Sequence, residues 1–552
     1  MRNIVNLICL SILICIISCD DSGFVKIDAT KALPLQYIVK SDEDILSAAS
    51  SFGYSVKNKI SYDGSSYFLL ETSQSLNKVE SNLRSLCEID WIELEQKRLL
   101  SDADSEFQFP IYFNSYQAMY DISSLQKAVS HFGFGTNVAE ALIIDTGLNL
   151  NHIEFNDPNF FVGYSGYYRK ADGTTTAIVE TKAVTINGVD YSNVPIFQQM
   201  VSGINYDGNP NEGHGSHVAG IVAGSKKILG VCGKNCKVFG YKTFAYNKQG
   251  LSVSASGSDY GIYGAILHYL ANKENDKTAV INMSFGSLSP SRFETEVILA
   301  AVKNNLLPIA AAGNKSKIEC EFPATLNCVM CVTAANWDGS VAGFSSQNPT
   351  ASVSAVGKNV FSVKGGSNDG YCYMEGTSMA TPYVTGLAAY LLTLAPSLSV
   401  GELRTIIEDG ATDKGDVGQD PQYGYGLVDV YNSAAMATEH QKYIDTSGVE
   451  GTLVTSRYYE ATVSVYVYKE VNQSSLTQKV AQTGTVAYLY KTDSPTAGSF
   501  TFYSVGVVQK DGLCTFAMLE EGSYRLAVGT NYLEFDLDFT NPLVDLELKI
   551  EP

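Results

Sequence analysis

Residues 139–145, AEALIID, form an apolar run broken only by Glu140 and ending in a carboxylate. Three similar runs follow, TAVINMSF at 278–285, LLPIAAAGN at 306–314 and CVMCVTAA at 328–335, with helix-length segments between them. Strands that read as continuous apolar runs are typical of a parallel sheet covered on both faces. The sequence therefore predicts an α/β unit with helices on both faces of a parallel sheet.

Polar side chains stand at or just after the ends of three of these runs. They are Asp145, Ser284 and Asn314. The carboxyl ends of parallel strands lie at one edge of a sheet, and ligands of such sheets bind beyond that edge. We therefore expect these three residues at the functional edge of the sheet.

Different patterns flank the α/β unit. From Leu35 to about Arg98, strand-like and helix-like stretches follow the order of a small split βαβ sandwich. After Gly448, short alternating stretches predict an all-β antiparallel sandwich. Within it, DGLCTFAMLEEGSYRLAVG at 511–529 resembles prealbumin-like sandwich modules. The predicted divisions are 1–18, 19–105, 106–440 and 450–552.

The first of these divisions predicts export. Arg2 precedes an apolar run at 4–17, which is too short for a membrane span and suits a signal-peptide core. The run ends in IISC at 16–19, which resembles the lipobox of bacterial lipoproteins, with Ile16 where Leu is usual. The resemblance implies a lipid on Cys19 as the membrane tether of a cell-envelope protein. An ordinary signal peptide is the alternative.

The charge balance excludes one class of partner. Lys and Arg number 38 against 58 Asp and Glu, which gives a net charge of −20. A phosphate backbone would repel such a protein, so we expect no nucleic-acid partner.

Cysteine usage fits an oxidising compartment. Of 11 cysteines, Cys9 and Cys15 would leave with the signal peptide and Cys19 would carry lipid, so 11 − 3 = 8 remain. An even count is compatible with some local disulfide bridging, and its connectivity stays open. Cys328 and Cys331 lie within an apolar run, which indicates core or disulfide cysteines and not a metal site.

Three short motifs carry chemistry. They are Asp145-Thr146-Gly147 after a strand, GHGSHVAG at 213–220 and GTSMATP at 376–382. Nucleophilic attack on an acyl group needs a hydroxyl, a base that takes its proton and a carboxylate that orients the base. Ser378, His214 and Asp145 would supply these three groups. Apolar residues at helical spacing after Ser378 also place it at a helix N-terminus, where developing negative charge is favoured.

These motifs, in the order Asp, His, Ser, resemble the subtilisin-like serine proteases, the subtilase family, over about residues 110–437. The resemblance implies that His214 is the general base and that His217 is structural. It implies that Asn314 and the backbone N–H of Ser378 form the oxyanion hole. It also implies that Ser284, Phe285 and Gly286 form a strand that pairs with an extended peptide.

No cofactor is expected for this chemistry. His214 and His217 lack an acidic partner at zinc-protease spacing, so no metal residues are predicted, although structural calcium is common in the family. No acidic cluster stands near the motifs, which favours uncharged or apolar side chains over Lys or Arg before the cleaved bond.

The segment 19–105 gains a role from the same resemblance. Its position and its ending, CEIDWIELEQKRLL at 87–100, resemble the family's propeptide, whose tail inhibits the active site. We therefore expect a zymogen cleaved between about 97 and 110, with polypeptide substrates and its own propeptide as partners. Because Cys19 belongs to the propeptide, cleavage would free the protease from the membrane. The alternative function is a catalytically silent surface lipoprotein that binds other proteins.

Overall fold

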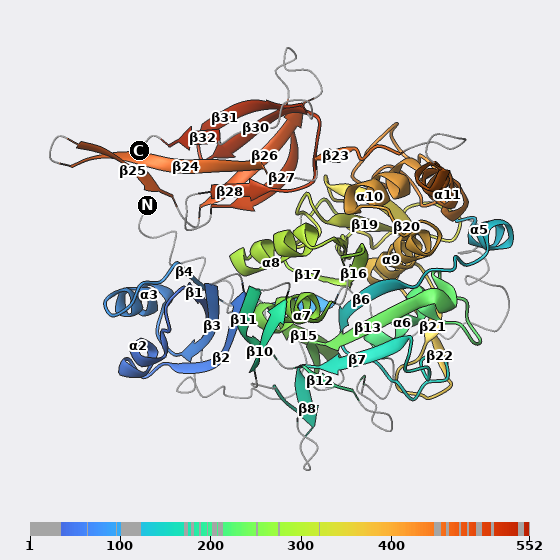
Figure 1. Cartoon of the computed structure of the whole chain (residues 1–552), viewed down its shortest axis with the longest axis horizontal. Coiled ribbons are helices and arrows are strands. Elements are labelled where there is room, and N and C mark those ends of the chain that lie inside the picture. The colour runs from blue at the N-terminus through green and yellow to red at the C-terminus, as the bar shows by residue number, and fades with distance from the viewer. Residues whose placement is uncertain are drawn as a thin grey trace, which may run out of the picture.

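A computed structural model describes residues 35–62, 65–94, 97–100, 123–169, 175–177, 181–186, 189–195, 197–200, 207, 213–249, 252–273, 276–319, 321–446, 454–459, 463–473, 476–482, 485–492, 500–508, 513–538 and 546–550. The expected signal peptide and Cys19 lie outside these residues, as does most of the expected cleavage region. The described chain forms an N-terminal unit, a central unit and a C-terminal unit (Figure 1).

The central unit is built on one sheet, whose strands are β6 (Ala139–Asp145), β7 (Phe161–Ser165), β12 (Gln198–Gln199), β13 (Cys236–Lys242), β16 (Ala279–Met283), β18 (Leu306–Ala311), β19 (Met330–Ala335) and β20 (Ala351–Val356). Their order is β12-β7-β13-β6-β16-β18-β19-β20. Neighbours from β7 to β20 are parallel, while the edge strand β12 is antiparallel. Strands β16 to β20 are buried at every residue, which explains their continuous apolar sequences.

Helices cover this sheet, which confirms the predicted α/β fold. They are α5 (Leu125–Phe132), α6 (His214–Ala223), α7 (Asp259–Asn272), α8 (Arg292–Lys303), α9 (Thr377–Leu394), α10 (Val400–Asp409) and α11 (Val430–Thr446). In Figure 1, α7 and α8 lie on the side of the sheet nearest the N-terminal unit, and α6 and α9 lie on the other side. The side chains of Ser258, Ser291 and Ser399 accept backbone N–H bonds at the starts of α7, α8 and α10, which fixes where these helices begin.

Shorter elements surround the sheet. They are β8 (Tyr167–Arg169), β9 (Thr175–Ala177), β10 (Thr181–Ile186), β11 (Val189–Pro195), η1 (Gly233–Asn235), β14 (Phe244–Gln249), β15 (Ser252–Ser258), β17 (Phe285–Gly286), β21 (Val360–Val363) and β22 (Tyr371–Met374). Four of them form two antiparallel hairpins, β8–β9 and β10–β11.

The N-terminal unit has the predicted element order. It consists of β1 (Leu35–Ser41), α2 (Leu46–Ser51), β2 (Ser55–Tyr62), β3 (Ser65–Thr72), α3 (Leu76–Arg84) and β4 (Trp91–Leu94). The strands form one sheet in the order β2-β3-β1-β4, and every pair is antiparallel. This unit contacts α8, where Glu296 accepts a hydrogen bond from Tyr67 at 2.6 Å and pairs with Lys40 at 3.0 Å.

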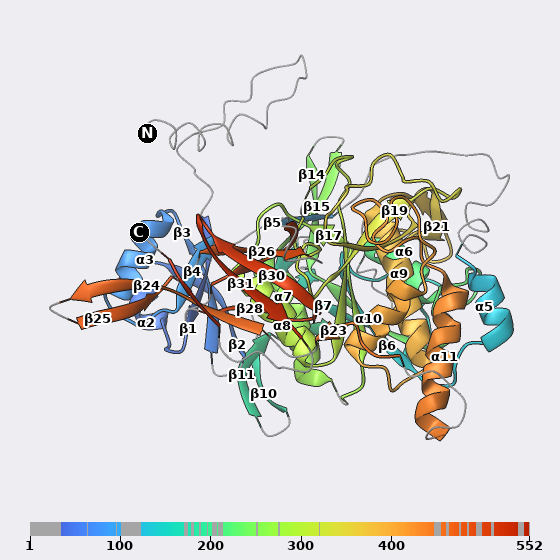
Figure 2. The same ribbon diagram turned by 90° about the horizontal axis from the view of Figure 1, so that it is seen from above.

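The last described strand of the N-terminal segment, β5 (Lys97–Leu100), leaves that sheet. It lies between β15 and β17 of the central unit and pairs antiparallel with both. Figure 2 shows the three strands side by side. The end of the N-terminal segment thus completes a small sheet on the central unit.

The C-terminal unit is a two-sheet sandwich, as predicted. Its strands are β23 (Tyr458–Tyr459), β24 (Val463–Gln473), β25 (Leu476–Ala481), β26 (Val486–Thr492), β27 (Thr501–Val507), β28 (Leu513–Phe516), β29 (Leu519–Glu520), β30 (Gly522–Val528), β31 (Asn531–Leu537) and β32 (Leu546–Lys549). One sheet contains β25, β24, β28 and β32, and the other has the order β27-β26-β30-β31. The sequence predicts antiparallel pairing throughout, but β24 and β32 are parallel. Alternating inward residues of both sheets, such as Val465, Leu489 and Leu526, form one core.

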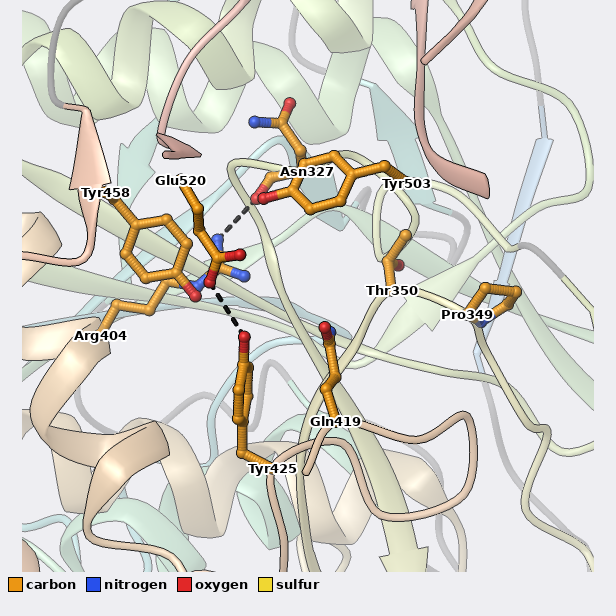
Figure 3. Close-up of a pocket in the computed structure, with 9 residues that line it drawn as sticks. All are labelled: Asn327, Pro349, Thr350, Arg404, Gln419, Tyr425, Tyr458, Tyr503 and Glu520. Carbon is orange, nitrogen blue, oxygen red and sulfur yellow. Dashed lines mark hydrogen bonds between the residues drawn. The ribbon is translucent and has the colours of Figure 1, made fainter. Parts of the chain in front are cut away.

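A buried cluster of charged and tyrosine side chains joins this sandwich to the central unit (Figure 3). Within α10, Arg404 Nε donates to Glu408 Oε1 at 2.9 Å, and Tyr458 donates to the other Glu408 oxygen. Tyr425 donates to Glu520 Oε1 at 2.9 Å across the same junction. The cluster surrounds a cavity of about 20 Å³, which has room for a single water.

We expect Arg404→Met to lower the free energy of unfolding by about 3 kcal/mol, because it removes the buried cation that lies 2.9 Å from the Glu408 carboxylate. Arg457 is the control, since it is more exposed, pairs with Asp409 at the edge of the cluster and lies farther from Glu408, at 3.7 Å. Arg457→Met should change that free energy by less than about 1 kcal/mol. Denaturant unfolding of the full chain measures both variants, and equal losses would contradict the special role of Arg404.

Seven cysteines lie among the described residues, Cys87, Cys232, Cys236, Cys328, Cys331, Cys372 and Cys514, and no two of them are joined. The expected local bridging is therefore not observed in this part of the chain. Cys328 and Cys331 lie in the core, as their apolar run predicts, and burial raises the pKa of Cys328 to about 12. Within the described ranges, no helix combines the length and apolar character that crossing a bilayer requires.

Candidate active site

Asp145 and His214 meet at the carboxyl edge of the sheet. Asp145 ends β6, and His214 is the first residue of α6. Nδ1 of His214 lies 2.7 Å from Oδ1 of Asp145, and both side chains are almost completely buried. A carboxylate bound at Nδ1 favours the tautomer with its proton there, so Nε2 can accept a proton from a reacting group.

A second layer of polar groups fixes this pair. Thr146 Oγ1 donates to Asp207 Oδ1 at 2.6 Å and accepts the Gly215 N–H at 2.8 Å. The other Asp207 oxygen accepts the Ser216 N–H at 2.7 Å. Thr146 and Asp207 therefore satisfy backbone donors at the start of α6 that have no partner within the helix. This holds His214 in place.

Lys242 is buried beside the same layer. Its Nζ donates to the carbonyl oxygen of Thr146 at 2.6 Å. Burial lowers the pKa of Lys242, and the charges of Asp207 and Asp145 oppose that change. Burial raises the pKa of Asp207, while hydrogen bonds and Lys242 lower it. The carboxylates thus share a buried cation.

Ser378 lies in the first turn of α9 and is fully buried. Its Oγ donates to the carbonyl oxygen of Ser284 at 3.1 Å, and Ser284 Oγ donates to the Ser378 carbonyl at 3.0 Å. This second bond accommodates Pro382, which lies inside α9. Proline has no N–H for the carbonyl four residues earlier, and the Ser284 hydroxyl takes its place there.

Asn314 follows β18 beside the start of α9. Its Oδ1 accepts the backbone N–H of Thr377 at 2.9 Å and the Thr377 hydroxyl at 3.1 Å. Because both bonds use the amide oxygen, the Nδ2 donors point away from Thr377. Gly313 makes the turn with a φ of +103°, a conformation that favours glycine. The Asn314 side chain is thus held in one orientation, with Oδ1 bound to Thr377 and Nδ2 directed away from it.

Ser284, Phe285 and Gly286 border the site as a strand. In β17, Phe285 pairs with Leu100 of β5 and Gly286 pairs with Leu99. On the other side of β5, Ser256 of β15 also pairs with Leu99. An extended segment therefore already lies between two strand edges that lead to Ser378.

The structure pairs Asp145 with His214, and it places Ser284, Ser378 and Asn314 around the start of α9. The expected lipidation residue, Cys19, lies outside the described residues. His217 is held in the core, with Nε2 3.1 Å from the Val360 carbonyl oxygen, as suits a structural histidine. Asp207 and Lys242 were not predicted, because nothing in their local sequence marks them. Asn282 carried a signal: it is polar within an apolar run, and its Nδ2 donates to Ser284 Oγ at 2.9 Å. Among the residues with described placement, no three His, Cys, Asp or Glu side chains gather as a metal site.

Known proteins are similar to this chain in sequence or in fold. The chain is 34% identical over 221 residues to the thermostable alkaline protease of Halalkalibacterium halodurans, a match that covers 40% of this chain and only 56% of that protein. It is 34% identical over 241 residues to subtilisin DY of Bacillus licheniformis, covering 43% of this chain and 82% of that protein. Fervidolysin from Fervidobacterium pennivorans shares the fold, with a TM-score of 0.65 and 17% identity over 96% of this chain and 79% of that chain.

The family comparison covers most of the α/β unit. The model of the subtilase family matches residues 138–426, which is more than half of the 552 residues. That stretch contains the Asp145–His214 pair, Ser378 and Asn314 in the geometry described above. The chain belongs to the subtilase family.

Proposed function

We propose that this protein is an exported serine endopeptidase, made as a zymogen, that hydrolyses peptide bonds through Asp145, His214 and Ser378. The observation that carries the proposal is the buried 2.7 Å contact between His214 Nδ1 and Asp145 Oδ1. Ser378, in the first turn of α9, would be the nucleophile. Family membership and the likeness to alkaline proteases and subtilisin DY support it.

The chemistry begins at the Ser378 hydroxyl. Its Oγ leaves the Ser284 carbonyl, attacks the peptide carbonyl carbon and gives its proton to His214 Nε2. The carbonyl electron pair moves onto oxygen. The intermediate then collapses, the C–N bond breaks, and Nε2 returns the proton to the leaving amine. Water attacks the acyl-enzyme in the same way, with His214 as base, and releases the acid.

Two groups would stabilise the oxyanion. Nδ2 of Asn314 and the backbone N–H of Ser378 are donors at the start of α9, where the helix dipole also favours negative charge. Because Thr377 fixes the Asn314 amide before any substrate arrives, little reorganisation is needed during the reaction.

The zymogen part of the proposal rests on β5. This strand occupies the place between β15 and β17 where an extended substrate would pair. While the N-terminal unit is attached, its tail excludes other peptides. If Cys19 carries lipid, the anchor belongs to this unit, and cleavage releases the protease from the cell envelope.

Labelling by a serine-directed phosphonate tests the proposed function. The purified, self-processed protein should gain the mass of one phosphonyl group, and peptide mapping should place it on Ser378. Lack of labelling, in protein that has lost its N-terminal unit, would refute the proposal and favour a protein-binding role instead.

Release of the N-terminal unit should depend on pH through Glu93. Its carboxylate accepts hydrogen bonds from Ser291 Oγ at 2.8 Å and from the Arg292 and Phe293 N–H groups at 3.0 and 3.3 Å, at the start of α8. Burial raises the pKa of Glu93 from 4.5 to about 7. Release exposes the group and returns the pKa to its ordinary range.

The N-terminal unit therefore binds the central unit more tightly when Glu93 is protonated. Its binding weakens as the pH rises from about 4.5 through about 7. We expect the cleaved unit to dissociate about tenfold faster or more at about pH 8 than at about pH 5, measured by recovery of activity after dilution. Glu93→Gln should flatten this dependence, and Glu88→Gln, an exposed change on the same unit, should not. An unchanged profile in Glu93→Gln would contradict the prediction.

A further inference from the structure

An acidic side chain that the proposed mechanism does not use lies beside the substrate strand. Glu321 is only 6% exposed. A methyl group built on Gly286 would lie 2.6 Å from Glu321 Oε2, and one built on Gly313 would lie 2.5 Å from its Cδ. The carboxylate is therefore pressed against the backbone of β17 on one side and of the loop before Asn314 on the other.

The register of β17 shows which part of a substrate reaches this place. A bound strand pairs with Gly286 and Phe285, and its next residue falls opposite Ser284, which is hydrogen-bonded to Ser378. That next residue is the one whose carbonyl Ser378 would attack, here called the acyl-side residue. Its side chain would lie near Gly286 and the loop at 312–314, the two backbone segments that Glu321 faces.

The two backbone segments next to Glu321 each have a glycine at the point of contact, Gly286 in β17 and Gly313 in the loop. A side chain at Gly286 or Gly313 would collide with the carboxylate, so Glu321 fills the volume that larger residues would occupy. The Phe322 N–H donates to the Ser287 carbonyl at 2.7 Å, which fixes the segment that carries Glu321 against the end of β17. The Glu321 carboxylate is therefore held beside the expected place of the acyl-side side chain.

The charge of Glu321 is poorly compensated. Within the described part of the chain, its carboxylate accepts no hydrogen bond. The nearby charged groups are Glu319, which pairs with Lys317 at 3.1 Å, and Lys315. Burial first and Glu319 second raise the pKa of Glu321 to about 7, and Lys315 opposes them. A buried carboxylate in this state gains most from a cationic partner.

We propose that Glu321 sets the primary specificity of this protease and selects Lys or Arg as the acyl-side residue. The inference rests on the proposed endopeptidase function and names its substrate class. It replaces the expectation of uncharged side chains, which followed from looking for acidic residues in the motifs alone. Glu321 lies seven residues beyond Asn314 and reaches the site through the fold.

The test uses self-processed protein and peptide amides that differ only at the acyl-side residue. With Lys, Arg, Met and Leu as that residue, we expect kcat/KM for Lys and Arg to exceed that for Met by about tenfold or more. Glu321→Gln should lower kcat/KM for Lys and Arg by about ten- to a hundredfold and change Met and Leu by less than about threefold.

Glu319→Gln is the matched control, because it removes the same charge two residues away. It should change the Lys-to-Met ratio by less than about threefold. Equal effects of the two variants would overturn the contact role of Glu321, as would a wild type that prefers Leu. Failure of the protease function itself is seen separately, as loss of phosphonate labelling and of cleavage of every peptide.

A pH series gives a second readout. The Lys-to-Met ratio of kcat/KM cancels the ionisation of His214, since both substrates use the same base. We expect this ratio to rise as the pH increases through about 7, because only the ionised Glu321 pairs with a cation. A ratio that is independent of pH in the wild type would contradict the proposal.

Discussion

Ser378→Ala should lower kcat on unfolded casein by about a millionfold, a magnitude known from subtilisin itself. The substitution removes the attacking oxygen, and α9 stays in place because the bond from Ser284 Oγ to the carbonyl oxygen of residue 378 does not depend on the side chain. The same variant should remain a single chain, since removal of the N-terminal unit needs the same nucleophile. Casein hydrolysis and intact mass, followed in parallel with the wild type, measure both effects.

Cell fractionation extends this comparison. If lipid on Cys19 is the tether, the wild-type central unit should leave the membrane fraction after cleavage, while Ser378→Ala should stay there. A processed wild-type central unit that resists washing with salt or urea would contradict release. Casein hydrolysis by Ser378→Ala at the wild-type rate would refute the assignment of the nucleophile.

Asn314→Ala should lower kcat by about 100- to 1,000-fold, the range known for the corresponding donor of subtilisin. KM should change little, because the oxyanion exists only at the transition state and not in the bound substrate. Steady-state kinetics on a single peptide amide separate the two constants.

Thr377→Val is the control for this prediction. Valine keeps the backbone N–H that binds Asn314 Oδ1 and loses the hydroxyl, which donates to Asn314 Oδ1 and accepts the Gly313 N–H at 3.2 Å. We expect a fall in kcat of less than about tenfold, since one of two positioning bonds remains. A loss as large as that of Asn314→Ala would indicate that the loop has collapsed and that Asn314 acts only in the structure.

The sequence predicts the site best where one short pattern indicates both a buried strand and the polar residue at its end. Asp145, Ser284 and Asn314 could be placed because each ends an apolar run, and parallel strands bring such ends together. Asp207, Lys242 and Glu321 could not, because burial and partners distant in the chain give them their roles.

Strand partners show the same limit. An alternating pattern predicts a strand in the sandwich but does not say which neighbour it pairs with. This is why the parallel pairing of β24 with β32 was missed. The prediction of helix boundaries has a related limit. A proline usually marks the end of a helix, but Pro382 lies inside α9, where a hydroxyl from Ser284 bonds the carbonyl that the proline leaves without a partner.

The site between β15 and β17 also limits which conformations of a protein substrate can be cleaved. A segment that enters it must offer both of its backbone edges at once, and a segment within a helix or a sheet has already used them. Susceptibility of a protein should therefore follow the free energy of opening a few residues locally. Well-folded proteins would survive contact with this enzyme, and damaged or unassembled chains would not. Pairing with β15 and β17 would thus restrict cleavage to proteins that are locally unfolded.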